Sequence, residues 1–154
     1  MKHESGRSMI EMLGVLAIMG VITGGAILLI SSAMRTQKRN TVNEEVIQIV
    51  MGVRQLLGEY DDFSNINSST IFSVMGMSSK NPYGGTYELS VDPANSRQFV
   101  VSVTGLADAD CEYFATKAWA DSVGYMNSDG RQSGATGMCN LGNGKNVVKI
   151  TYGE

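Results

Sequence analysis

The chain has 154 residues, a formal net charge of −3 and a single histidine, His3. This length fits one globular domain, and the slight acidic excess argues against a broad basic surface for nucleic acid. With the only histidine beside the N-terminus, the body of the chain lacks the residue needed for a Ser-His-Asp triad, a Cys-His pair or a histidine-rich metal site. We therefore expect neither an enzyme nor a metal or cofactor site.

A charge-free apolar run of 19 residues extends from Met12 to Ile30. As a helix it would be roughly 28 Å long, close to the thickness of a bilayer core. A buried helix of a soluble protein and a cleaved secretory signal are the alternatives. The first rarely runs this long without a charge, and the second has a shorter core with a small-residue cleavage site close behind it. The run predicts a membrane-spanning helix.

Residues 6–13, which read GRSMIEML, resemble the class III signal of type IV pilins and related pilin-like proteins. In that family a dedicated peptidase cuts after the Gly of a short polar leader, on the cytoplasmic side, and the fifth residue of the mature chain is Glu. The resemblance implies a leader of residues 1–6, cleavage between Gly6 and Arg7, and N-methylation of Arg7. It also implies that Glu11 acts in assembly, by neutralising the N-terminal amine of a neighbouring subunit. Arg7 departs from the usual Phe or Met.

Within the apolar helix, Gly20 and Gly24 form a G-x-x-x-G pattern that offers a small-residue surface for close helix approach. The resemblance divides the chain beyond its leader into two parts. Residues 7–30 would form the transmembrane and filament-core helix, and residues 31–154 a globular head that includes the amphipathic half of the same helix.

The charges that flank the apolar run give a mixed signal for membrane orientation. Lys2 and Arg7 precede the run, and Arg35, Lys38 and Arg39 follow it. Counting Lys and Arg places the C-terminal side in the cytoplasm, whereas the cysteines described below indicate the opposite side.

An amphipathic pattern continues the helix beyond the apolar run. No Pro interrupts the stretch from Arg7 to Tyr60, which predicts one helix over that length. Asp61 and Asp62 then open a polar loop, with a short apolar piece at residues 71–77. The apolar positions of the amphipathic half recur at three- and four-residue spacing: Val42, Val46, Ile49, Val50, Val53, Leu56, Leu57 and Tyr60.

Turn-forming residues then alternate with apolar strands. Turns at residues 81–85 and 92–96 bracket a strand at 86–91, and a second strand follows at 98–104 before Gly105 ends it. This spacing predicts an antiparallel hairpin.

A second helix is expected from about Asp108 to Ser122. The Gly-, Ser- and Asn-rich residues 124–145 predict a long exposed loop, and residues 147–152 a third strand. The elements together predict an α+β fold in which a small antiparallel sheet packs on the long helix, and they are similar to the head of type IVb pilins. The core-facing stripe of the second helix would comprise Phe114, Ala115, Ala118 and Trp119.

Two cysteines, Cys111 and Cys139, lie at the start of the second helix and in the late loop. An even pair in an exported domain indicates a disulfide, and one disulfide is common in the pilin family; two unrelated buried thiols are the alternative.

Asp108 and Asp110 are better explained by the dipole of the first helical turn than by a cation site.

The resemblance implies a structural subunit of a type IV pilus, assembled from the bacterial inner membrane into an extracellular helical filament. Its partners would be further copies of itself, the prepilin peptidase, and the assembly motor and platform. A minor pilin or a type II secretion pseudopilin carries the same signal, so cell adhesion and secretion both stay open as roles. The alternative of another class is a single-pass anchored periplasmic binding domain, which predicts neither cleavage nor a filament.

Overall fold

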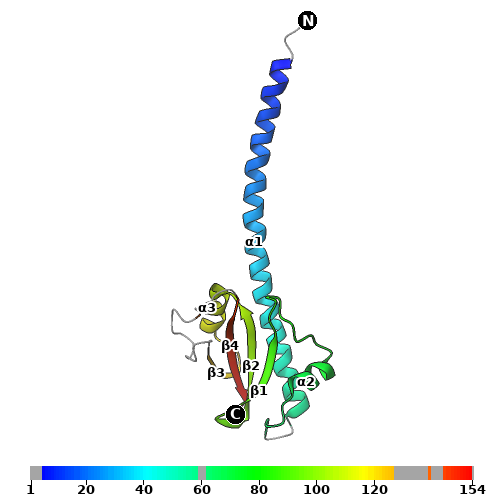
Figure 1. Cartoon of the computed structure of the whole chain (residues 1–154), viewed down its shortest axis with the longest axis vertical. Coiled ribbons are helices and arrows are strands. Elements are labelled where there is room, and N and C mark those ends of the chain that lie inside the picture. Colours follow the sequence, from blue (N-terminus) through cyan, green and yellow to red (C-terminus); the bar gives the residue numbers. More distant parts are fainter. Residues whose placement is uncertain (1–4, 59–61, 127–138, 140–143, 154) are drawn as a thin grey trace. The chain divides into compact units, whose positions relative to one another are not determined.

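The computed structural model describes residues 5–58, 62–126, 139 and 144–153 (Figure 1). The chain divides into two compact units, Met1–Lys38 and Arg39–Glu154. The first helix, α1 (Ser5–Leu57), contributes residues to both units. It confirms the single long helix, although α1 ends at Leu57, and the predicted end at Tyr60 lies outside the described residues.

In the first unit, every described side chain from Ser8 to Lys38 is exposed. Among the described residues, α1 is the one helix long and apolar enough to cross a membrane, and none of its most apolar stretch is buried within the chain. Large apolar side chains such as Val21 and Leu29 are about three-quarters exposed, at 78% and 74%. Such a surface has to be covered by lipid or by protein.

The second unit is built on a four-stranded antiparallel sheet whose strand order is β1-β2-β4-β3 (Figure 1). The last strand in chain order therefore pairs on both sides, with β2 and with β3. The sequence predicted three strands and missed β3. The strands are β1 (Tyr87–Asp92), β2 (Asn95–Leu106), β3 (Ser122–Met126) and β4 (Asn146–Gly153).

One face of this sheet and the amphipathic half of α1 form the core of the second unit. Alternate residues of the strands supply the sheet side, because successive side chains point to opposite faces. On α1, Val42, Val46, Ile49 and Val53 are fully buried, which confirms the three- and four-residue spacing. The buried residues of the sheet face are Tyr87, Leu89, Phe99, Val101, Val103, Val148, Ile150 and Tyr152.

Residues 71–75 of the short apolar piece predicted at 71–77 belong to helix α2 (Ser68–Met75). Asn67 precedes the helix, and its side chain accepts hydrogen bonds from the backbone N–H groups of Ser69 and Thr70. Gly76 ends the helix in the left-handed region, with φ of 65°. Capping at both ends explains why a helix this short forms.

The second predicted helix is shorter than expected. Helix α3 (Asp108–Thr116) ends six residues before Ser122, because Lys117 is extended and the indole Nε1–H of Trp119 donates a 3.0 Å hydrogen bond to the carbonyl of Phe114. Trp119 is buried as predicted, although it lies beyond the end of the helix. Ala118 is exposed, so its predicted place in the apolar stripe is wrong. The loop predicted at 124–145 begins inside β3, and most of it lies outside the described residues.

Gly105 does not end the second strand, as predicted, but lies inside β2 at an irregularity in its pairing with β4. Its φ is 76°, and the backbone of Gly85 passes directly beside it. The side chain of Asn81 connects the turn before β1 to β2 next to this glycine. The buried side chain of Asn81 donates to the carbonyl of Thr104 at 2.7 Å and accepts from the backbone N–H groups of Tyr83 and Gly85.

We expect Gly105→Ala to lower the free energy of unfolding by about 1–3 kcal/mol, because its φ disfavours a side chain. Its Cβ would also lie 2.7 Å from the Cα of Gly85. Gly84→Ala is the matched control, since Gly84 also has a positive φ, 86°, but no atom within 4 Å of the added carbon. Urea unfolding of the full chain in detergent measures both. Equal losses would show that the close approach to Gly85 contributes nothing.

Candidate functional site

The residues that the resemblance to the pilin signal indicated lie on α1 in the first unit. Glu11 is exposed, and its neighbours Ile10 and Met12 are exposed at 73% and 64%. α1 begins at Ser5, so Gly6 and Arg7 are within it, but the position of the Arg7 side chain lies outside the described residues. A carboxylate on an apolar helix is costly in a membrane unless an opposite charge accompanies it.

A Cβ added at Gly20 or Gly24 meets nothing within 4 Å. The two glycines therefore leave an open, flat strip on α1 to which another helix backbone can approach closely. Thr23 lies between them, and its hydroxyl donates a 2.8 Å hydrogen bond to the carbonyl of Met19, so its polar atom is satisfied within the helix. This part of α1 can thus face an apolar surrounding without an unpaired hydroxyl.

In the second unit, Cys111 and Cys139 form the disulfide, with an S–S distance of 2.04 Å and a Cα–Cα distance of 5.8 Å. This confirms the predicted pair and excludes two unrelated thiols. The two residues are 1% exposed or less. Asp108 and Asp110 lie in the first turn of α3, as predicted for residues that favour its dipole. No group of three or more His, Cys, Asp or Glu side chains comes together in the described part of the chain.

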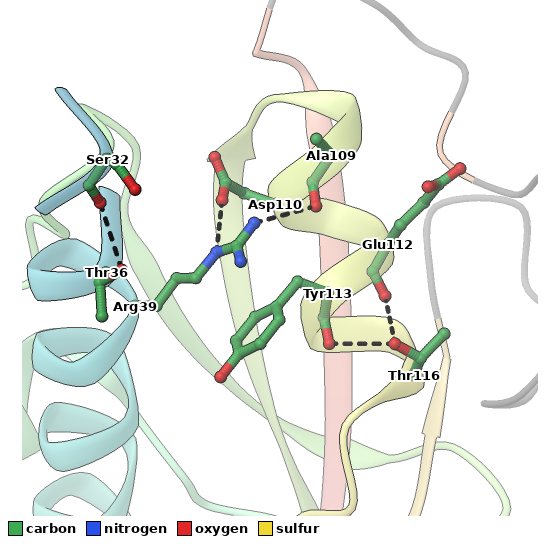
Figure 2. A network of polar contacts seen from close by, with 8 residues as sticks. All are labelled: Ser32, Thr36, Arg39, Ala109, Asp110, Glu112, Tyr113 and Thr116. Atoms are coloured by element: carbon green, nitrogen blue, oxygen red, sulfur yellow. Dashed lines mark hydrogen bonds and ion pairs between the residues drawn. The ribbon is translucent and has the colours of Figure 1, made fainter. Parts of the chain in front are cut away.

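The sequence did not predict how α3 is attached to α1. Arg39 was grouped with the charges that flank the membrane run, but its Nε donates a 2.8 Å hydrogen bond to Oδ1 of Asp110 (Figure 2). The guanidinium also lies 4.1 Å from the ring centroid of Tyr113. The Asp110 side chain is only 5% exposed, and the Arg39 guanidinium compensates its charge.

The other polar side chains around the α1 surface have shifted pKa values with clear causes. Burial, reinforced by the negative charge of Asp110, raises the pKa of Tyr83 to about 12. Burial and a hydrogen bond to the Glu45 carboxylate raise the pKa of Tyr87. Partial burial lowers the pKa of Lys117. Tyr83 and Tyr87 therefore stay protonated near neutral pH, which indicates a role in packing and not in proton transfer.

No protein-family model matches the chain. The toxin coregulated pilin of Vibrio cholerae serotype O1 is 27% identical over 138 residues, which cover 80% of this chain and 59% of the relative. The major structural subunit of the bundle-forming pilus of Escherichia coli O127:H6 is 27% identical over 128 residues, which cover 75% of this chain and 65% of the relative. The chain thus spans less than two-thirds of the length of these two proteins.

Solved structures show the same fold. TcpA, a type IV pilin from the El Tor biotype of Vibrio cholerae, matches with a TM-score of 0.55 over 75% of this chain and 98% of that structure, at 13% sequence identity. The predicted resemblance to the type IV pilins is confirmed. The type IVb pilin of Salmonella typhi covers the same share of this chain and 99% of its own, with a TM-score of 0.50 and 11% identity. Both matches cover three-quarters of this chain, and at these identities they show a shared fold.

Proposed function

We propose that the chain is a structural subunit of a type IV pilus. In this proposal residues 1–6 are a leader, residues 7–30 anchor the subunit in the inner membrane and later form the filament core, and residues 31–154 form the head. The observation that carries the proposal is the combination, in one pilin-like chain, of a folded head with an apolar helix segment whose described side chains are all exposed.

The exposed segment explains why one helix would serve two environments. In the membrane, its apolar side chains are covered by lipid; in a filament, the same side chains would be covered by the helices of neighbouring copies. Burial contributes roughly 25 cal/mol per Å² in either case, so transfer between the two places need not expose apolar area to water. The partners implied are copies of this chain, and the peptidase, motor and platform that process and move it.

The two orientation signals can be weighed against each other. Three positive residues follow the apolar run and two precede it, a difference of one. The Cys111–Cys139 disulfide is the stronger signal, because a disulfide is stable in an oxidising compartment and rare in the cytosol. It supports a head on the periplasmic side before assembly and outside the cell afterwards. Relatives that are pilus subunits support a pilus over a secretion pseudopilin.

Two measurements on the purified protein and on intact cells test the proposal. Mass spectrometry is expected to find a mature chain that starts at Arg7, with one methyl group on its amine, and electron microscopy to find surface filaments that contain it. A chain that keeps Met1 and forms no filaments would instead identify a single-pass anchored domain.

Replacing Gly6 by a bulky residue, as in Gly6→Leu, is expected to block processing, because the peptidase has to fit closely around the chain at the bond it cuts. The precursor would accumulate, heavier than the mature protein by the mass of residues 1–6. Ser5→Leu, one residue before the proposed site, is the matched control and should be processed. Mature protein of normal mass from the Gly6 variant would refute the assigned cleavage site.

A further inference from the structure

Helix α3 is fastened to α1 at both of its ends by polar side chains. At its first turn, Nε of Arg39 donates to Oδ1 of Asp110 at 2.8 Å, and Nη2 donates to the carbonyl of Ala109 at 3.4 Å (Figure 2). Just past its last turn, Nζ of Lys117 donates to Oδ1 of Asn43 at 2.5 Å. Arg39 and Asn43 are four residues apart, so they lie on the same face of α1, one turn from each other.

Each end also has an aromatic partner. The Arg39 guanidinium lies 4.1 Å from the centroid of the Tyr113 ring, and Nζ of Lys117 lies 4.6 Å from that of Trp119. Cations over aromatic faces at these distances are attracted by the ring quadrupole. We call the four polar side chains, Arg39, Asn43, Asp110 and Lys117, the α3 latch.

The disulfide makes a different connection. Cys111 follows Asp110 directly, but its partner Cys139 belongs to the segment before β4 and not to α1. The bond therefore ties that segment to α3, whereas the latch ties α3 to α1. The two connections share no residue.

We propose that the α3 latch holds α3 on α1 without the disulfide, so that α3 is docked before Cys111 and Cys139 are oxidised and stays docked when the bond is reduced. The disulfide then fastens the segment around Cys139 to a helix that is already in place. This goes beyond the pilus function, because it concerns the order in which the head is completed and holds whether or not the chain forms filaments.

Hydrogen exchange read by mass spectrometry tests the latch on the full chain in detergent. Four samples are compared: the wild type and Arg39→Gln, each oxidised and each reduced with dithiothreitol. The exchange rates of the α3 amides in the reduced wild type are expected to lie within about threefold of those in the oxidised wild type. In reduced Arg39→Gln the same amides are expected to exchange about tenfold faster, or more, than in the reduced wild type. Oxidised Arg39→Gln should stay close to the oxidised wild type.

Arg54→Gln is the matched control, since it also removes an arginine from α1. The ion pair of Arg54 with Asp121 is longer, at 3.6 Å, and exposed. It should not change α3 exchange in either redox state. If Arg39→Gln also accelerates exchange in β2, the head has unfolded. Asn43→Ala, which removes only the contact with Lys117, is then used in its place. In the reduced state it is expected to accelerate α3 exchange to an intermediate extent. Fast α3 exchange in the reduced wild type would overturn the proposal. So would full protection of α3 in reduced Arg39→Gln, or in reduced Asn43→Ala where that variant replaces it.

Discussion

Replacing Glu11 by valine is expected to abolish filament formation while leaving a stable, processed subunit in the membrane. Valine removes a costly carboxylate from an apolar helix, so insertion should be unchanged or improved. In the filament, however, the N-terminal amine of a neighbouring subunit would lose its opposite charge. An unpaired charge in such surroundings costs about 3–5 kcal/mol, which is enough to weaken each subunit contact roughly a hundredfold or more.

The measurement is the ratio of sheared filaments to membrane-bound subunit, together with the mass of the mature chain. Glu44→Val is the matched control, because Glu44 is an exposed carboxylate of the same helix within the head. It should assemble normally. Wild-type amounts of filament from Glu11→Val would exclude the charge-pairing mechanism, even for a chain that is cleaved as a pilin.

Replacing Phe99 by alanine is expected to lower the free energy of unfolding by about 3–5 kcal/mol. Phe99 is fully buried on the core face of the sheet, with its ring centroid 5.0 Å from that of Phe63 and 5.7 Å from that of Tyr152. Alanine would leave a cavity between them that the surrounding strands cannot close.

Urea unfolding of the full chain in detergent, followed by tyrosine and tryptophan fluorescence, measures this loss. Val123→Ala is the control, because Val123 is 55% exposed and its truncation should change stability by less than about 0.5 kcal/mol. A loss below about 1 kcal/mol for Phe99→Ala would mean that the packing of Phe99 against Phe63 and Tyr152 contributes little to stability.

The features that sequence alone predicted are those that depend on residues close together in the chain. The spacing of Val42, Val46, Ile49 and Val53 predicted the buried face of α1, and the turn residues around 92–96 predicted the β1–β2 hairpin. Each of these patterns reports the environment of a residue through its immediate neighbours in the chain. The length of the charge-free run likewise predicted a helix with the reach of a bilayer core.

The features that were missed depend on partners far away in the chain. β3 is five residues long and overlaps the start of the Gly-, Ser- and Asn-rich segment, and it is a strand because β4 supplies its hydrogen bonds. The end of α3 depends on the indole of Trp119, and the conformation of Gly105 on the neighbouring backbone of Gly85. Arg39 was interpreted from its distance to the apolar run, whereas its position is decided by Asp110, 71 residues later.

The strand order has a consequence for how the polypeptide matures during synthesis. β4, the last strand to emerge, occupies an interior place between β2 and β3. Until it arrives, β3 lacks its pairing partner in the described sheet and β2 has one open side. The apolar stretch of α1, by contrast, leaves the ribosome first. A nascent chain would therefore reach the membrane long before its sheet can close, and would spend the interval as a tethered, half-folded molecule.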